Sequence, residues 1–263
     1  MLKLDGYALV TGGSRGCGAA ICIQLAKDGY DVAVHYVSPS SKAKAEEVAE
    51  EVRKLGRKAC VVQGNQGVLE DCNRLVADTV AQMGEKMAIL VNNAGITCGN
   101  TFESTPYEKM EELVHVNYMG PMWIARAALP YLKQVKNSTI IMVSSLSAET
   151  TMGNAWYAGS KAAVIQSIKQ VGSNLGYSYG IRVNCCTPGT IRTDMINPEG
   201  NQEGIERISK ESPLGTIGEP EDIAECVSYL VGASFVTCEN ITVSGGVFSN
   251  NGRRGEVPIG NNK

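Results

Sequence analysis

The segment YALVTGGSRGCG, residues 7–18, decides the fold that this sequence predicts. A short apolar run leads into a glycine-rich turn, a helical pattern follows over residues 19–26, and a second apolar run occupies residues 32–36. This order of strand, glycine turn, helix and strand is the context in which such a turn indicates dinucleotide binding. It predicts an α/β sheet with its ligand beyond the carboxyl ends of the strands.

Three glycines of this turn have separate roles in such a site. Gly12 turns the chain, Gly16 lets the backbone approach a pyrophosphate, and Gly18 lets the helix pack closely on the strand. Free N–H groups at the helix start then face the phosphates. The spacing GxxxGxG departs from the commoner GxGxxG, and a turn of this composition can also be only a tight loop.

A second motif, WYAGSK at residues 156–161, points to proton transfer. Tyr157 and Lys161 lie four residues apart on a predicted helix and therefore share a face. A neighbouring ammonium favours phenolate, so the pKa of Tyr157 is expected to fall below its usual value of about 10. Such a tyrosine can exchange a proton with an alcohol or carbonyl oxygen. A core tyrosine beside a solvated lysine is the alternative.

Apolar runs predict seven buried parallel strands at residues 7–10, 32–36, 59–62, 88–91, 139–143, 182–186 and 241–243. Helical stretches alternate with them, including residues 41–55 and 107–133, which predicts one doubly wound Rossmann domain of α/β class. Pro121 is expected to kink the second of these helices. We expect residues 1–247 to form the dinucleotide-binding catalytic domain and residues 248–263 a loosely ordered tail.

The two motifs, in this order, resemble those of the short-chain dehydrogenase/reductase family. Further matches follow in the family's order: NNAG at residues 92–95, Asn117 within VNYMG, VSS at residues 143–145 and TPGTIRT at residues 187–193. The likeness covers about residues 5–247. Within the family the chain is most similar to the 3-oxoacyl-carrier-protein reductase branch, through GEPEDIAECVSYLV at residues 218–231 and ITVSGG at residues 241–246.

The resemblance implies a reductase in which hydride passes from NADPH to a ketone and Tyr157 delivers the proton. Lys161 would lower the tyrosine pKa and hold the nicotinamide ribose, while Asn117 would support a chain of waters. The cofactor contacts expected on this basis lie in the glycine turn, at or after the ends of four strands, and on the helix of Tyr157: Gly12, Ser14, Arg15, Gly16, Gly18, Tyr36, Ser38, Asn65, Gln66, Asn93, Ala94, Gly95, Tyr157, Lys161, Pro188, Gly189, Ile191 and Thr193.

Two serines compete for the catalytic position. Counting back from Tyr157 by the family's usual interval lands on Ser144, whereas aligning the strand TIIMVSS and counting from Asn117 lands on Ser145. A loop loses a residue more easily than a buried strand slips, because strand register decides which side chains face the site. We therefore predict Ser145, whose hydroxyl would bond the substrate oxygen as charge develops there.

The end of the second strand favours NADP(H). NAD-selective sites usually carry an acidic residue there, but HYVSPSSK has none. Arg15 and the hydroxyls of Ser38, Ser40 and Ser41 are suited to a 2′-phosphate. Alternatively, Ser38 caps the next helix and Arg15 is only solvated. Asn65 stands where many relatives have Asp, and its amide can still bond adenine.

The substrate is a small-molecule carbonyl compound that the sequence does not identify. Residues expected in its pocket include Cys98, Ser147, Trp156 and Met195. Cys98 and Gly99 replace a charged pair that is frequent in the reductase branch, so an acyl carrier protein substrate is in doubt. The alternatives are an NADP-dependent alcohol or sugar dehydrogenase and a protein that binds a substrate without net redox.

Composition excludes several other classes. The chain of 263 residues has a net charge of −3 and a pI near 5.6, which give no electrostatic reason to bind nucleic acid or an anionic membrane. No apolar stretch reaches the roughly 18 residues of a membrane span, and no signal peptide fits before the first strand. Nine cysteines without CxxC spacing and two isolated histidines predict neither disulfides nor a metal site, so we expect a cytoplasmic protein.

A homo-oligomer, either dimer or tetramer, is also expected. Val164, Ile168, Val171 and Leu175 recur at helical spacing downstream of Tyr157 and form an apolar stripe. The resemblance implies pairing through this helix and the long one before it. The alternative is that the stripe packs only on the chain's own sheet.

Overall fold

A single parallel sheet organises the molecule in this computed structural model, which describes residues 2–196, 200 and 202–247. Its seven strands lie in the order β3-β2-β1-β4-β5-β6-β7, and every neighbouring pair is parallel. The strands are β1 (Tyr7–Val10), β2 (Val32–Tyr36), β3 (Ala59–Gln63), β4 (Met87–Asn92), β5 (Thr139–Val143), β6 (Arg182–Pro188) and β7 (Asn240–Val243).

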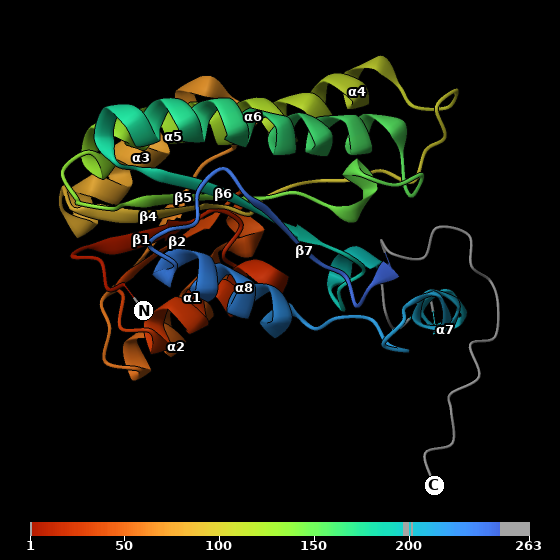
Figure 1. Ribbon diagram of the computed structural model, residues 1–263, viewed down its shortest axis with the longest axis horizontal. Helices are drawn as coiled ribbons and strands as arrows, with labels where there is room; N and C mark the ends of the chain where they lie inside the picture. The colour runs from red at the N-terminus through yellow and green to blue at the C-terminus, as the bar shows by residue number, and fades with distance from the viewer. Residues whose placement is uncertain (1, 197–199, 201, 248–263) are drawn as a thin grey trace, which may run out of the picture.

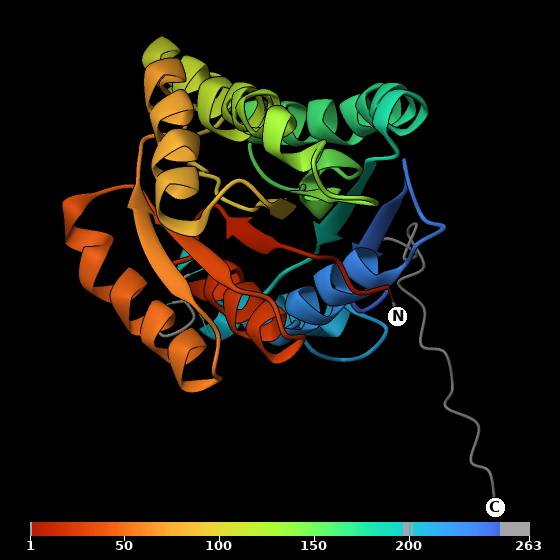
Figure 2. The same ribbon diagram turned by 90° about the vertical axis from the view of Figure 1, so that its left-hand side faces the viewer.

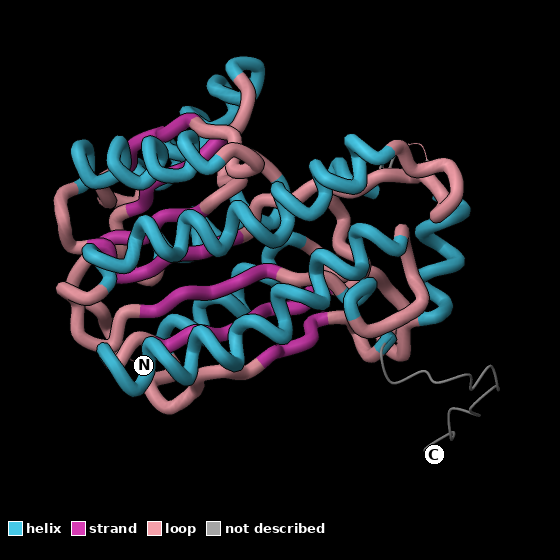
Figure 3. Tube along the Cα trace, turned by 90° about the horizontal axis from the view of Figure 1, so that it is seen from above, coloured by secondary structure: helices cyan, strands magenta, loops and turns pink. Residues whose placement is uncertain are grey.

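Helices cover both faces of this sheet (Figures 1 and 2). One face carries α1 (Gly16–Lys27), α2 (Lys42–Lys54) and α8 (Pro220–Gly232); the other carries α3 (Leu69–Met83), α5 (Gly120–Leu132) and α6 (Ala155–Tyr179). Two separate apolar cores result, one on each face of the sheet. Seen from above, the long helices run along the strands (Figure 3).

The remaining elements lie beyond the carboxyl ends of the strands, where α4 (Tyr107–Val114) and α7 (Gln202–Glu211) stand at the same end of the molecule (Figure 1). Short helical turns complete the chain: η1 (Pro39–Ser41), η2 (His115–Met119), η3 (Leu146–Ala148) and η4 (Asp194–Ile196). This end of the sheet is where a doubly wound fold places its ligand.

The predicted fold class is confirmed, and all seven strands lie within two residues of their predicted bounds. The central strands are buried along their whole length because helices cover both faces, so their sequences are continuous apolar runs rather than alternating ones. The predicted tail, residues 248–263, lies outside the described residues, and the division of the chain at residue 247 stays a prediction.

The predicted single helix over residues 107–133 is wrong in its middle. α4 and α5 are joined by a π-helical turn, His115–Met119, in which the Gly120 N–H bonds the His115 carbonyl. Pro121 lies in the first turn of α5, where its missing N–H is tolerated. The helix is therefore interrupted just before the proline, by one wider turn that carries Asn117.

Candidate active site

Four candidate catalytic side chains converge at the carboxyl end of the sheet. Ser145 follows β5, Asn117 lies in the π-helical turn, and Tyr157 and Lys161 occupy the first two turns of α6. Asn117 is fully buried and Lys161 is 4% exposed, so both polar groups depend on protein partners.

Tyr157 is held as a protonated phenol. Burial raises the pKa of Tyr157, and a hydrogen-bonding interaction with the Ser145 side chain lowers it by less. The expectation that this pKa falls below its usual value of about 10 is therefore wrong. Desolvation of the phenol outweighs the stabilisation of its charged form. At neutral pH the group has a proton to give.

Lys161 donates from Nζ to the carbonyl of Val143 at 2.8 Å, at the end of β5. Burial lowers the pKa of this ammonium to about 8. The Cβ that a side chain at Gly95 would add lies 3.2 Å from Nζ, so a larger residue there would crowd the lysine. The lysine thus lies between the ends of β4 and β5, beneath the residues that follow β4.

The two serines point in different directions. Ser144 donates from Oγ to the carbonyl of Lys161 at 2.9 Å and is 4% exposed, so its hydroxyl ties β5 to α6. Ser145 is half-buried, interacts with Tyr157, and accepts a hydrogen bond from the Ser147 N–H at 3.2 Å. Of the two hydroxyls, that of Ser145 is the one beside the phenol.

Asn117 fixes the chain that leaves β4. Its Oδ1 accepts from the Ile96 N–H and its Nδ2 donates to the Ile96 carbonyl, both at 2.9 Å. Nδ2 also donates to the Ser160 hydroxyl at 3.2 Å, on α6. The side chain therefore links the β4–α4 loop, residues 93–106, to the catalytic helix.

The glycine turn has the geometry that a pyrophosphate requires. Gly12 has a φ of +63°, and a Cβ on Gly18 would overlap the Gly12 carbonyl, so helix α1 can begin this close to β1 only with glycine there. Arg15 occupies the N-cap position of α1 without a side-chain cap among the described residues. The first N–H groups of α1, near Ser14 and Gly16, remain available to an anion.

His35 holds this turn from β2, although the sequence did not single it out for a role. Its Nδ1 accepts from the Gly12 N–H at 3.0 Å, and its Nε2 donates to the Gly64 carbonyl at 2.8 Å. The imidazole is fully buried, and burial lowers its pKa to about 4. Its position, as a polar residue inside an otherwise apolar strand, was the sequence signal that could have identified this role. The neutral ring joins the glycine turn to the end of β3.

Asn93 and Ala94 close the turn from the other side. Asn93 donates from Nδ2 to the Thr11 carbonyl at 2.9 Å, and the Ala94 N–H donates to the Thr11 hydroxyl at 3.0 Å. The Asn93 amide is thus occupied by the protein itself, and its contribution to a nucleotide site is to shape the backbone. Tyr36, at the end of β2, is buried beside this region.

The side-chain amide of Gln66 is used within the protein, and a contact of this residue with the cofactor stays a prediction. Gln66 is 2% exposed, and Nε2 donates to the Ala94 and Val116 carbonyls at 2.9 and 2.7 Å. Pro121 has no N–H with which to bond Val116, the residue five positions before it, so the glutamine supplies the donor. Asn65 remains exposed, with Oδ1 accepting from the Gly67 N–H at 3.0 Å.

The rim beyond β2 gathers hydroxyls without a carboxylate. Ser38 Oγ lies 2.8 Å from Ser40 Oγ and 3.1 Å from Ser41 Oγ. Within the described part of the chain, no side chain caps η1 or the start of α2, so the serines are not used as helix caps there. Arg15 lies 3.3 Å from the Asp194 carboxylate, and both side chains are about two-thirds exposed.

The chain after β6 returns over the glycine turn. Gly189 follows Pro188 with no room for a Cβ, because that atom would lie 2.8 Å from Ser244 Cα. Ile191 pairs with Gly218 in an isolated bridge. The Thr193 methyl carbon lies 3.2 Å from the position of a Gly16 Cβ, so the two nucleotide-side segments face each other.

The four residues predicted to line the substrate pocket come from four segments at this end of the sheet. Cys98 and Ser147 are half-buried, in the β4–α4 loop and in η3, while Met195 in η4 is 55% exposed. Trp156 stacks on Phe102, with ring centroids 6.0 Å apart and planes at 9°. A common pocket for the four stays a prediction.

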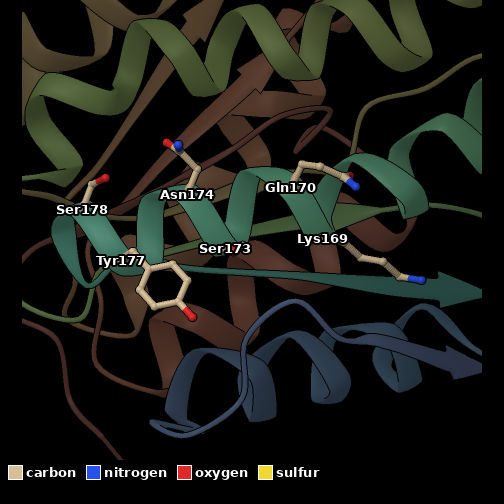
Figure 4. A pocket seen from close by; sticks show the side chains of 6 residues that line it. All are labelled: Lys169, Gln170, Ser173, Asn174, Tyr177 and Ser178. Atoms are coloured by element: carbon tan, nitrogen blue, oxygen red, sulfur yellow. The ribbon is translucent and has the colours of Figure 1, made fainter.

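A hollow along the outward face of α6 is a different feature. Lys169, Gln170, Ser173, Asn174, Tyr177 and Ser178 line it, all on this one helix (Figure 4). Its nearest member to Tyr157 lies twelve residues away, or about 18 Å along the helix. It is not part of the catalytic site.

Two features are absent from the described part of the chain. No group of three or more His, Cys, Asp or Glu side chains there is arranged to hold a metal ion. Among the same residues, no helix is long and apolar enough to span a membrane.

The predicted apolar stripe on α6 is largely internal. Val164, Ile168 and Leu175 belong to the core between α6 and the sheet, and only Val171 among the four is half-buried. The stripe therefore packs mainly on the chain's own sheet, while Val171 and Leu175 also line a groove between α5 and α6.

Comparison with known proteins agrees with this architecture. The family model described as "Enoyl-(Acyl carrier protein) reductase" matches residues 12–248. A short-chain dehydrogenase/reductase, FrzI, of Cladobotryum sp is 37% identical over 93% of this chain and 96% of its own length. The 3-oxoacyl-(acyl-carrier-protein) reductase FabG of Staphylococcus aureus is 35% identical over 94% of this chain and its own full length.

A solved structure is similar along the same span. The blue fluorescent protein from a metagenomic library, crystallised in complex with NADPH, has a TM-score of 0.85 and 33% identity, covering 92% of this chain and 97% of its own. The family model's span includes the glycines at residues 12, 16 and 18 and the Tyr157 site. The chain belongs to the short-chain dehydrogenase/reductase family.

Proposed function

We propose that the protein is an NADPH-dependent reductase that converts a ketone to an alcohol, with Tyr157 as proton donor. The observation that carries this proposal is the interaction between the Tyr157 and Ser145 side chains at the carboxyl end of the sheet. A phenol whose pKa is raised by burial keeps its proton at neutral pH, as a donor in a reduction must.

Each polar group has a task in this reaction. Bound NADPH would supply the hydride. Tyr157 gives its proton to the carbonyl oxygen, while the Ser145 hydroxyl donates a hydrogen bond to that oxygen as negative charge develops. Lys161 and Asn117 hold the ends of β5 and β4 in place from beneath, through Val143 and Ile96.

Preference for NADPH over NADH rests on the rim beyond β2. The hydroxyls of Ser40 and Ser41 lie within hydrogen-bond distance of the Ser38 hydroxyl, and the Arg15 guanidinium lies at the adjoining turn. The Asp194 carboxylate occupies Arg15 in this structure, and a 2′-phosphate would compete for it with greater charge. A relative of similar fold was crystallised with NADPH.

The proposed substrate is a small organic or acyl and polyketide-like ketone. Cys98 and Gly99 in the β4–α4 loop offer no charge to an acidic carrier protein, although FabG of Staphylococcus aureus is named for such a substrate. A free ketone therefore suits this loop better than a carrier-bound one.

A panel of ketones, screened for NADPH oxidation, tests the proposal. The wild type should reduce at least one member, and Tyr157→Phe should not. Turnover only in the direction of alcohol oxidation would show that the protein is a dehydrogenase rather than a reductase. A panel without any turnover would contradict the proposed function.

We also propose that the protein is a homo-oligomer that pairs through α5 and α6. An apolar groove runs between these helices and is lined by Met122, Ala125, Arg126, Leu129, Gln170, Val171, Asn174 and Leu175. The polar hollow beside it (Figure 4) would then lie at the edge of the contact.

Light scattering tests this assembly. The wild type should have a mass at least twice the 28.0 kDa of one chain, and Val171→Glu should lower it. Tyr229→Glu, on the opposite face in α8, is the matched control. A wild-type mass near that of one chain at micromolar concentration would remove the oligomer.

A further inference from the structure

Asn154, which precedes α6, has a side chain with four hydrogen bonds. It is 6% exposed. Oδ1 accepts from the N–H groups of Trp156 and Tyr157, at 2.9 and 3.3 Å. Nδ2 donates to the Asn100 carbonyl at 2.6 Å and to the Thr105 hydroxyl at 3.1 Å. Its acceptors therefore cap the helix that carries Tyr157, while its donors hold the β4–α4 loop.

The loop is fastened at both ends by asparagine amides. Asn117 holds its beginning through both polar groups of the Ile96 backbone, and Asn154 holds its end. The Thr105 hydroxyl continues the connection by donating to the Thr101 carbonyl at 2.6 Å. Between these points the loop carries Cys98, which is half-buried.

Ring stacking adds a contact between the same two segments. Phe102, at the tip of the loop, stacks on Trp156, although 71% of its surface is exposed. Trp156 is also one of the two residues whose N–H groups bond Asn154. The loop therefore contacts the first turn of α6 through one amide and one aromatic pair.

We infer that Asn154 is a positioning residue, which sets the β4–α4 loop against Tyr157 and so fixes one wall of the substrate site. The inference rests on the proposed function, because it assigns the loop to the ketone. Only an amide can make these bonds, since it supplies two donors and an acceptor that takes two hydrogen bonds. A hydroxyl or carboxylate in its place keeps an oxygen that caps the helix and lacks the two N–H donors that bind the loop.

Two substitutions separate these tasks. Asn154→Ser and Asn154→Asp both retain an oxygen that caps α6, and neither retains the amide donors toward Asn100 and Thr105. The serine variant carries no charge, so an effect shared by both variants comes from the lost donors. Phe102→Ala is the matched control that removes the stack and leaves every Asn154 bond in place.

The first measurement is amide hydrogen exchange without cofactor or substrate. Exchange should accelerate in peptides covering residues 96–106 of Asn154→Ser, while the amides of Trp156 and Tyr157 stay protected. Unchanged exchange in the loop would overturn the inference. This arm needs no substrate, so it decides whether Asn154 holds the loop even if no ketone is reduced, a result that would overturn the proposed function alone.

The second measurement separates binding from chemistry. Two lost hydrogen bonds should raise the KM for the ketone about tenfold in both variants, with kcat and the NADPH Kd nearly unchanged. Phe102→Ala should leave loop exchange at its far end, near Thr105, unaltered. An unchanged KM, or a fall in kcat together with lost protection of Tyr157, would show that Asn154 is only a helix cap.

Discussion

On the nucleotide side of the site, strand ends and backbone groups set the geometry, whereas on the proposed substrate side amide side chains fasten a loop to a helix. Gly12 lies between His35 on one strand, which accepts a hydrogen bond from its N–H, and Ala94 after another, which leaves no room for a Cβ. The β4–α4 loop is held at its two ends by Asn117 and Asn154, and its tip is exposed.

The difference indicates how each side responds to change. The nucleotide side is part of the sheet, so altering it alters the stability of the fold. The substrate side is an attachment to the sheet, so altering it can change specificity at a small cost in stability. Local opening is expected first where few buried contacts hold the chain.

The largest effect is expected at Tyr157, where the two sides meet. Tyr157→Phe removes the proton donor and should lower kcat by about 10² to 10⁴-fold while the NADPH Kd stays near normal. Tyr177→Phe is the matched control, because Tyr177 is on the same helix and 93% exposed. More than a tenth of wild-type turnover in steady-state assays of Tyr157→Phe would contradict the assignment.

The next effect separates two adjacent serines. Ser145→Ala should lower kcat by about 10² to 10³-fold, as loss of one donor to a developing oxyanion does. Ser144→Ala loses a bond to the Lys161 carbonyl and should cost about 1 kcal/mol of unfolding free energy with little change in kcat. Reversed losses of activity in the purified variants would show that the spacing to Tyr157, rather than strand register, places the serine.

The third effect concerns stability on the nucleotide side. His35 has a folded pKa of about 4, below its ordinary 6.5, so the unfolded chain takes up the proton first as pH falls. Stability should therefore decrease from pH 6.5 to pH 4, by about 3 kcal/mol from this group.

Urea unfolding of His35→Asn tests this dependence. The variant keeps an acceptor for the Gly12 N–H but has no titrating group at this position. It lacks the stability that the neutral imidazole contributes above pH 6.5, so it should be less stable than the wild type at pH 7. The two curves should converge toward pH 4. Parallel curves would mean that the imidazole does not contribute to the acid lability of the fold.

The smallest effect lies at the exposed rim. NADPH should bind about tenfold or more tightly than NADH, and Arg15→Ala should narrow that difference, since a charge-assisted contact contributes about 1.5 to 3 kcal/mol. Arg53→Ala, another exposed arginine on α2, is the control. Equal dissociation constants of the two cofactors in fluorescence titrations would show that Arg15 and Ser38 do not select NADPH over NADH.

Much of the sheet and its ligand end could be predicted from sequence. Buried parallel strands are continuous apolar runs, and the roles of Gly12 and Gly18 follow from the lack of a Cβ. The bond partners of buried side chains could not be predicted, because they join segments far apart in sequence. For this reason the inward orientation of Gln66, which bonds Val116, was not predicted. Helical spacing on α6 likewise could not show which apolar residues the chain's own sheet covers.

Two residues were missed although a local signal existed. Asn154 directly precedes a predicted helix, where asparagine is a preferred cap, and that position alone indicates a helix start. The groups to which its amide donates, on Asn100 and Thr105, lie some fifty residues away in sequence and give no local pattern. His35 interrupts an apolar strand, but its partner Gly64 could be identified only in the folded chain.

The π-helical turn at His115–Met119 also constrains the length of the chain. A π turn accommodates about one residue more than an α turn, and each residue rotates a helix by about 100°. Because the wider turn takes up its extra residue within about one revolution, deleting one residue here would close the turn to α geometry with little rotation of α4 relative to α5, and would remove the local geometry that directs Asn117 to Ile96. Related sequences should therefore tolerate exchange of residues in this turn more readily than insertion or deletion.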